Sequence, residues 1–129
     1  MRIAMATNKV LVVEDDEALA RAVAAVLQGG GFAVATAATC AEGLASLHSE
    51  RPDLLLLDIC LPDGDGWQVL AAARDRGLLP AVPVVVISGH SIPRSRLREW
   101  GVFRFLAKPF DMAGLLETLR EALGHKRRR

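Results

Sequence analysis

The chain has 129 residues, which suits one domain, and 51% of them are apolar, which is enough to build one core. This composition excludes a disordered or collagen-like chain. The net charge is +1, but residues 1–65 carry ten acidic and four basic residues, whereas residues 66–129 carry five acidic and twelve basic residues. One small domain therefore brings an acidic half and a basic half together.

Two further features argue against a membrane protein and against a cysteine-based site. Apolar runs such as 54–57 and 84–87 are far shorter than the ~20 residues that span a bilayer. The first residues do not resemble a signal peptide, so we expect a soluble, cytoplasmic protein. Cys40 and Cys60 have neither CxxC nor metal-ligand spacing, and we expect them to be free thiols.

Short apolar runs alternate along the chain with segments of helical periodicity. Five of the runs have the length and composition of β-strands: 10–13, 32–35, 54–57, 82–87 and 103–107. The first helix is expected to end at the glycines 29–31, because glycine accepts the left-handed conformation at a helix end. The second is expected to begin at Thr39, since Thr39 and Glu42 have the spacing of a capping box, and to end before Pro52.

Three more helices are predicted in the second half of the chain. The third extends from about Gly66 to Gly77. The fourth has only about two turns between Pro93, which suits a first helical turn, and Gly101. Asp111 is expected to cap the fifth helix.

Five β-α units with uniformly apolar strands predict an α/β fold in which helices cover both faces of a five-stranded parallel sheet. The expected topology is flavodoxin-like, (βα)5, with strand order 2-1-3-4-5. We expect this domain to occupy residues 9–124, with a disordered segment at 1–8 and a basic tail at 125–129.

In a doubly wound sheet, ligands bind beyond the carboxyl ends of the strands. Polar residues follow four of the five predicted strands there: Glu14 and Asp15, Asp58, Ser88, and Lys108. The first and third strands are neighbours in this topology, so their carboxylates are expected to meet, with the hydroxyl and the lysine opposite. Asp16, in the same acidic run, is expected to cap the following helix instead.

These residue types point to phosphoryl chemistry. Clustered carboxylates repel one another unless a cation lies among them, and an all-oxygen site favours Mg²⁺ over zinc. Asp58 has the position of a nucleophile for a phosphoryl group. Mg²⁺ and Lys108 would offset the charge of the phosphoryl oxygens, and the Ser88 hydroxyl would hydrogen-bond to one of them.

Four blocks in this order and spacing resemble the receiver domain of two-component response regulators, including the chemotaxis-type regulators: 10–16, 58–66, 85–89 and 108–110. The resemblance implies that Asp58 accepts a phosphoryl group from a sensor histidine kinase or a phosphotransfer protein. It implies that Glu14, Asp15, Asp58 and the backbone carbonyl of Cys60 hold Mg²⁺ or Mn²⁺. It also implies a switch serine or threonine at Ser88, a switch aromatic at Phe105 and a phosphoryl-binding lysine at Lys108, with loop support from Pro62, Gly66 and Pro109.

A phosphoryl group on Asp58 would add charge and acceptor oxygens, which Ser88 would reach by moving inward with its loop. The ring of Phe105 would then turn into the vacated space. We expect this to shift a pre-existing equilibrium on the face formed by the fourth helix, the fifth strand and the fifth helix, where an unknown downstream target or a second copy of the chain binds.

Other functions were weighed against this one. A phosphatase of the haloacid dehalogenase type needs a second aspartate at the position of Cys60, and the chain has no GxxxxGK[ST] motif for nucleotides. A receiver-like domain that is never phosphorylated, and the amino-terminal part of a longer transcriptional regulator, remain open. We expect no enzymatic activity beyond the chain's own phosphorylation and dephosphorylation. We expect no direct nucleic-acid binding either, because no DNA-reading unit fits after Leu123.

Overall fold

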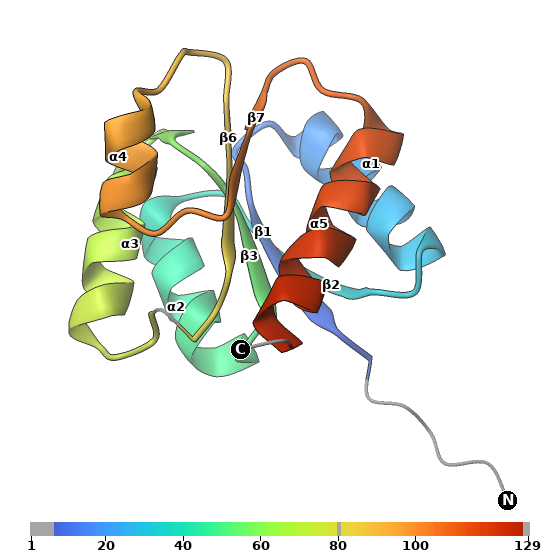
Figure 1. The fold of residues 1–129 in the computed structure, drawn as a ribbon, viewed down its shortest axis with the longest axis horizontal. Helices are drawn as coiled ribbons and strands as arrows, with labels where there is room; N and C mark the ends of the chain where they lie inside the picture. Colours follow the sequence, from blue (N-terminus) through green and yellow to red (C-terminus); the bar gives the residue numbers. More distant parts are fainter. Residues whose placement is uncertain (1–6, 80, 128–129) are drawn as a thin grey trace, which may run out of the picture.

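The computed structural model describes residues 7–79 and 81–127, without the side chains of 126 and 127. Five parallel strands form its central sheet: β1 (Lys9–Val13), β2 (Ala33–Ala37), β3 (Leu54–Asp58), β6 (Val84–Ser88) and β7 (Arg104–Ala107). Their order is β2-β1-β3-β6-β7 (Figure 1). Because β6 and β7 are the fourth and fifth strands of this sheet, the predicted order 2-1-3-4-5 is confirmed.

Helices cover both faces of the sheet, as expected. Helices α1 (Glu17–Gly29) and α5 (Met112–Arg127) lie on one face, and α2 (Cys40–Glu50), α3 (Gly66–Asp75) and α4 (Arg94–Glu99) lie on the other (Figure 1). One element was not predicted. A short antiparallel hairpin, formed by β4 (Cys60–Leu61) and β5 (Gly64–Asp65), lies between β3 and α3.

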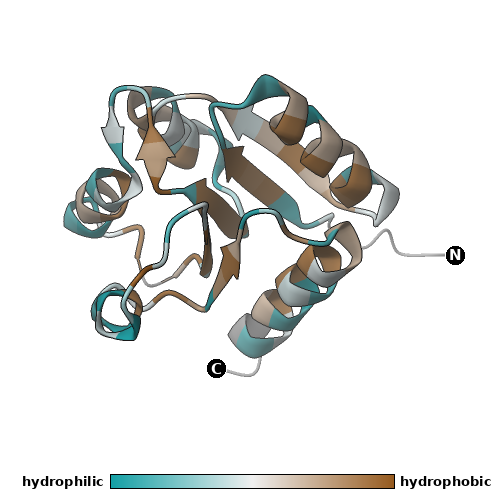
Figure 2. Cartoon of the chain, turned by 90° about the horizontal axis from the view of Figure 1, so that it is seen from above, coloured by the Kyte–Doolittle hydropathy of each residue, from teal (hydrophilic) through white to brown (hydrophobic). Residues whose placement is uncertain are grey.

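The three central strands have alternate side chains in two separate cores. In β3, Leu54 and Leu56 pack on the face of α1 and α5, whereas Leu55 and Leu57 pack on the face of α2 and α3, and all four are fully buried. Burying one leucine stabilises a fold by roughly 2 kcal/mol. Figure 2 shows the strands as hydrophobic, while the helices carry hydrophilic residues as well.

The helix ends follow the signals in the sequence. The Asp16 carboxylate accepts a hydrogen bond from the Leu19 amide and caps α1, and the Thr39 hydroxyl accepts one from the Glu42 amide and caps α2. Gly31 after α1 has φ +95°, a conformation that favours glycine. The Asp111 carboxylate likewise accepts a hydrogen bond from the Ala113 amide at the start of α5.

Two strand boundaries differ from the expected ones by two residues, and the others differ by one residue at most. Strand β6 begins at Val84 and not at residue 82, because Pro83 has no N–H to donate to a ladder. Strand β2 continues to Ala37, where it pairs with Val13, although its composition is a weak strand signal.

The expected segments at the two ends fall partly outside the described residues. Of segment 1–8, residues 1–6 lie outside, and the Asn8 carbonyl accepts a hydrogen bond from the Ala33 amide beside the sheet. Of segment 125–129, residues 128–129 lie outside, and α5 continues to Arg127. Within the described ranges, no helix is long and apolar enough to cross a membrane.

Candidate functional site

The carboxyl edge of the sheet brings three acidic side chains together. Glu14 follows β1, Asp58 ends β3 and Asp15 follows Glu14, and one carboxylate oxygen from each lies within 4.8 Å of the others. Glu14 and Asp58 are each only 2% exposed, whereas Asp15 is exposed. The neighbouring positions of β1 and β3 in the sheet therefore place two buried carboxylates and one accessible carboxylate at a single point, as the topology predicted.

Lys108, which follows β7, is the cation in contact with this cluster. Its Nζ lies 2.6 Å from Asp58 Oδ2 and 2.6 Å from Glu14 Oε1. The contact with Asp58 is a hydrogen bond, whereas Glu14 Oε1 is buried and accepts no hydrogen bond of good geometry. The Lys108 amide donates to the Ser88 carbonyl at 2.8 Å, so the lysine is held at this edge by its backbone as well.

Burial and neighbouring charges shift the pKa values of Glu14 and Lys108. Burial raises the pKa of Glu14 to about 7, against the lowering effect of its contact with Lys108, and the charge of Asp58 raises it further. Burial lowers the pKa of Lys108, but its contacts with Asp58 and Glu14 outweigh this, so the pKa is raised overall. Lys108 therefore stays charged, and its ammonium contacts the carboxyl groups of Glu14 and Asp58.

The residues present fit a divalent cation. Glu14 Oε1 is a buried oxygen that contacts the Lys108 ammonium without a hydrogen bond of good geometry, and the cluster offers only oxygen ligands, which suits Mg²⁺. The Cys60 amide donates to Asp58 Oδ1 at 3.0 Å, so residue 60 lies beside the acidic group. Asp16 is not part of the cluster, because its carboxylate caps α1.

Ser88 and Phe105 lie on the two strands beyond β3. Ser88, the last residue of β6, is 1% exposed, and its hydroxyl accepts a hydrogen bond from the His90 amide at 3.0 Å. Phe105, on β7, pairs with Val86 in the ladder. Its half-buried ring packs on the α2 and α3 side of the sheet, whereas Phe103 packs on the α1 and α5 side.

The three loop residues expected to support the site have different surroundings. A side chain at Gly66 would place its Cβ 2.8 Å from the Asp58 carbonyl oxygen, so only glycine lets α3 begin so close to β3. Pro62 is exposed in the hairpin turn. Pro109 follows Lys108 through a cis peptide bond.

The β4–β5 hairpin was missed, although the sequence contains a signal for it. Pro62-Asp63-Gly64 is a sequence typical of tight turns, and because Leu61 pairs with Gly64, Pro62 and Asp63 form the two-residue loop. The two strands contain only two residues each, so no strand periodicity accompanies this turn signal.

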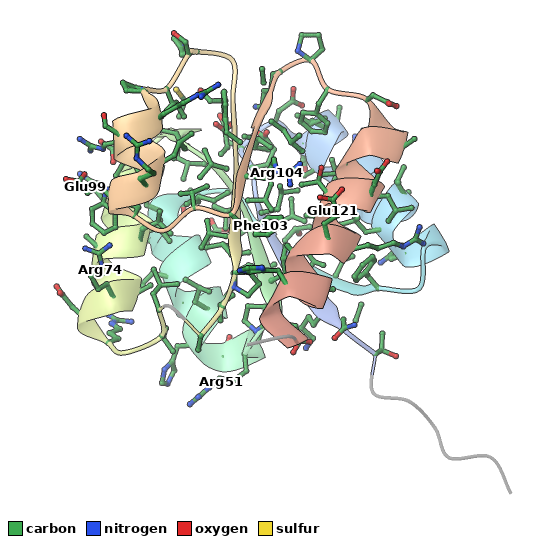
Figure 3. The ribbon with its side chains drawn as sticks, viewed as in Figure 1. Arg51, Arg74, Glu99, Phe103, Arg104 and Glu121 are labelled. Atoms are coloured by element: carbon green, nitrogen blue, oxygen red, sulfur yellow. The ribbon has the colours of Figure 1, made fainter. Side chains whose placement is uncertain are left out.

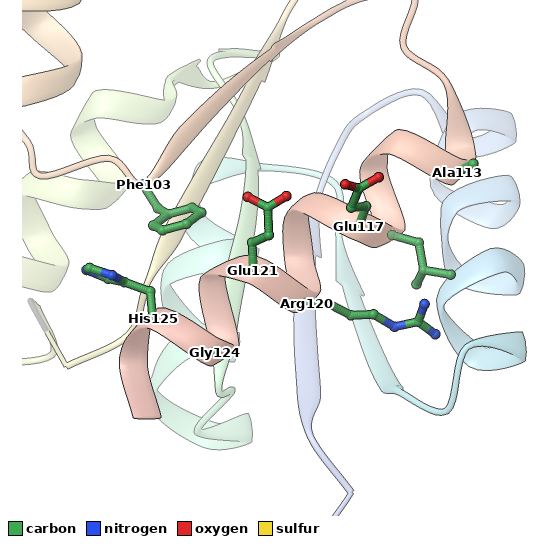
Figure 4. A pocket seen from close by; sticks show the side chains of 8 residues that line it. Phe103, Ala113, Glu117, Arg120, Glu121, Gly124 and His125 are labelled. Carbon is green, nitrogen blue, oxygen red and sulfur yellow. The ribbon is translucent and has the colours of Figure 1, made fainter. Parts of the chain in front are cut away.

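A hollow lies beside α5, and the acidic cluster of Glu14, Asp15 and Asp58 does not line it. It has a volume of about 740 Å³, and Figure 4 shows the side chains that line it. They are Phe103, Ala113, Leu116, Glu117, Arg120, Glu121, Gly124 and His125. None of the predicted phosphoryl-binding or metal-binding residues is among them.

Comparisons with known proteins show the family and confirm the fold. Residues 10–120 match the response regulator receiver domain family, and the chain belongs to this family. It is therefore a receiver domain of two-component response regulators. The fold is also that of solved receivers: a CheY-like response regulator receiver domain protein from Methanospirillum hungatei JF-1 superposes with a TM-score of 0.87 and 29% identity, over 95% of this chain and 98% of that chain.

Curated relatives with sequence similarity are longer than this chain. The KDP operon transcriptional regulatory protein KdpE of Escherichia coli strain K12 is 39% identical over 118 residues, which cover 90% of this chain and 51% of KdpE. The DNA-binding transcriptional regulator NtrC of the same strain is 33% identical over 118 residues, which cover 90% of this chain and 25% of NtrC. The chain thus spans about half of KdpE and a quarter of NtrC.

Proposed function

We propose that this receiver domain accepts a phosphoryl group on Asp58. An oxygen of the carboxylate attacks the phosphorus of a phosphohistidine on a sensor histidine kinase or a phosphotransfer protein, the P–N bond breaks, and the histidine nitrogen keeps the electron pair and takes up a proton. The observation that supports this most directly is the 2.6 Å contact of Lys108 Nζ with Asp58, beside Glu14 and Asp15. This arrangement places positive charge where the phosphoryl oxygens would lie.

The residues around Asp58 have separate roles in this proposal. Glu14, Asp15, Asp58 and the Cys60 carbonyl would hold Mg²⁺ or Mn²⁺, which supplies positive charge against the phosphoryl oxygens. Lys108 exchanges part of its contact with Asp58 and Glu14 for a phosphoryl oxygen. The Ser88 hydroxyl, now bonded to the His90 amide, turns inward to donate to another phosphoryl oxygen.

The same movement of Ser88 makes the domain a switch. Ser88 and Phe105 lie on adjacent strands, and the half-buried ring of Phe105 has room to turn when the loop after β6 moves. The face formed by α4, β7 and α5 then changes its shape and its affinity for a downstream target or a second copy of the chain. A fixed Phe105 rotamer with and without a phosphoryl analogue on Asp58 would contradict this step.

Incubation with acetyl phosphate and Mg²⁺, followed by intact-protein mass spectrometry, tests the acceptor assignment. We expect the wild type to gain one phosphoryl group and Asp58→Asn to gain none. Asp16→Asn is the matched control, because Asp16 lies in the same acidic run but caps α1, and it should be phosphorylated like the wild type. An unmodified wild type would favour the alternative of a receiver-like domain that is never phosphorylated.

The lengths of KdpE and NtrC support a second part of the proposal, that this domain regulates a transcriptional output domain in a longer protein. In this reading the receiver itself has no enzymatic activity beyond its own phosphorylation and dephosphorylation, works in the cytoplasm and does not contact nucleic acid. Whether the coding frame continues into an output domain tests the link to transcription.

Sedimentation of the phosphorylated and unphosphorylated chain tests whether it forms a homodimer.

A further inference from the structure

The hairpin β4–β5, which contains residue 60, is attached to the start of helix α2 by one side chain. Asp63 Oδ1 accepts a hydrogen bond from the Cys40 amide at 2.7 Å, and Asp63 Oδ2 accepts one from the Ala41 amide at 3.1 Å. The Cys40 thiol adds a weaker link, because its Sγ lies 3.4 Å from the Asp65 carbonyl oxygen. Both oxygens of Asp63 are therefore used in contacts between two separate segments of the chain.

These contacts are more than the ordinary solvation of a surface acid. Asp63 is exposed, but its carboxylate lies at a helix N-terminus, where amides have no partner within the helix and the helix dipole favours negative charge. The two amide hydrogen bonds hold the pKa of Asp63 below its usual value. Asp63 is thus ionised at neutral pH, so both of its carboxylate oxygens can accept these hydrogen bonds.

The hairpin needs such an attachment. Its ladder contains only the pairs Cys60 with Asp65 and Leu61 with Gly64, and so short a two-stranded ribbon is not stable alone. Leu61 anchors one strand, since it is 9% exposed and packs in the core on the α2 and α3 side. The turn beyond Leu61 is held by Asp63.

We propose that Asp63 is a positioning residue for the metal site. By attaching the hairpin to α2, it holds Cys60, whose amide donates to Asp58, beside the acidic cluster, so that the Cys60 carbonyl would be available to a divalent cation. Asp63 itself touches neither the cation nor the phosphoryl group. This inference rests on the proposed function, because the position of the carbonyl matters only if the acidic cluster binds a cation.

Titration calorimetry with Mg²⁺, and electron paramagnetic resonance with Mn²⁺, test this role in the whole chain. Asp63→Ala should bind either ion about tenfold more weakly than the wild type, as is typical when a group that supports a metal ligand is lost. Asp63→Asn should be intermediate, since an amide oxygen still accepts one hydrogen bond. Thr39→Ala is the matched control, because the Thr39 hydroxyl caps the same helix through the Glu42 amide at 3.0 Å. We expect its affinity to stay within about twofold of the wild type.

A second measurement needs no metal. The Cys40 and Ala41 amides should exchange their hydrogens faster in Asp63→Ala than in the wild type, in a chain whose circular dichroism shows it folded. Wild-type metal affinity in Asp63→Ala, or an equal loss in Thr39→Ala, would overturn the positioning role. A wild type that binds Mg²⁺ but accepts no phosphoryl group would contradict only the proposed function, and one that binds no Mg²⁺ would overturn both.

Discussion

Helices α1 and α4 both follow a strand whose carboxyl end contributes to the candidate site, yet they differ in how much apolar surface they bury against the sheet. Helix α1 has 13 residues and a side-chain cap, and its Ala20, Val23 and Leu27 are buried. Helix α4 has six residues, no side-chain cap and no buried residue. The side of the site with Glu14 and Asp15 is therefore rigid, whereas the side with Ser88 leads into a loosely attached helix.

Aromatic and cation–π contacts replace apolar burial at α4. The rings of Trp67 on α3 and Trp100 at the end of α4 are stacked at 6.5 Å, with Arg74 over Trp100 and Arg96 over Trp67. Arg74 also donates to the Glu99 carbonyl at 3.2 Å, and Figure 3 shows both residues between α3 and α4. Each such contact contributes about 1 kcal/mol, which is less than the burial of one core leucine, so α4 is attached to the fold more weakly than α1.

The largest difference between the two helices should appear in core truncations. Leu27→Ala on α1 should lower the free energy of unfolding by about 3 kcal/mol, because Leu27 is fully buried. Leu97→Ala on α4 should cost less than about 1 kcal/mol, because Leu97 is only half-buried. Urea denaturation measures both, and equal losses would show that α4 is attached as firmly as α1.

Glu14, on the α1 side of the site, should make the free energy of unfolding depend on pH, and no such dependence is expected from the α4 side. The pKa of Glu14 is about 7 in the folded, metal-free protein and near 4.5 in the unfolded chain, so the folded state binds the proton more tightly between these values. Its contribution to stability is complete below pH 4.5 and is lost as the pH rises through 7. From pH 5 to pH 7.5 we expect a loss of about 2 kcal/mol.

Denaturation of the EDTA-treated protein at these two pH values checks this prediction. Glu14→Gln should remove the dependence, because an amide does not titrate. Glu99→Gln, on the exposed side of α4, is the control and should keep it. A dependence that survives in Glu14→Gln would assign it to another group.

Disrupting the stack of Trp67 and Trp100 should lower stability by a smaller amount and change a specific spectroscopic signal. The chain contains two tryptophans and no tyrosine, so its near-ultraviolet circular dichroism reports mainly on the contact between α3 and α4. Trp100→Ala should abolish the coupled tryptophan signal and lower stability by about 1.5 kcal/mol. Trp67→Phe, which keeps a ring in the stack, should lose less. An unchanged spectrum in Trp100→Ala would show that the stack does not form in solution.

The smallest effect is expected at the ion pair between Arg104 on β7 and Glu121 on α5. Its atoms are 3.0 Å apart, but the side chains are 47% and 44% exposed, so water and salt screen the attraction (Figure 3). A double-mutant cycle with Arg104→Ala and Glu121→Ala should give a coupling of about 0.5 kcal/mol that disappears in 1 M salt. A coupling above about 2 kcal/mol would show that solvent does not screen the pair between Arg104 and Glu121.

Strand order and the acidic cluster were predictable because they depend on local and periodic signals. Apolar runs between capped helices define the parallel sheet, and the residues directly after each run must lie at its carboxyl edge. Glu14, Asp15, Asp58 and Lys108 were therefore assigned to one edge without knowledge of any distance, and the structure places them in contact.

Contacts between side chains of distant segments could not be predicted in the same way. The exposed Asp63 reads as one more surface acid until the fold brings it to the amides of Cys40 and Ala41, 23 and 22 residues earlier. Trp67 and Trp100 each read as a separate apolar residue until α3 and α4 lie side by side.

The sequence by itself thus determined the α/β class, the strand order and the chemistry of the acidic edge, because local propensity and periodicity specify which elements form and where they end. Only the tertiary structure decided the attachment of the β4–β5 hairpin to α2 and the aromatic contact that holds α4. These features depend on the packing of elements against one another, which brings together residues that no local pattern connects.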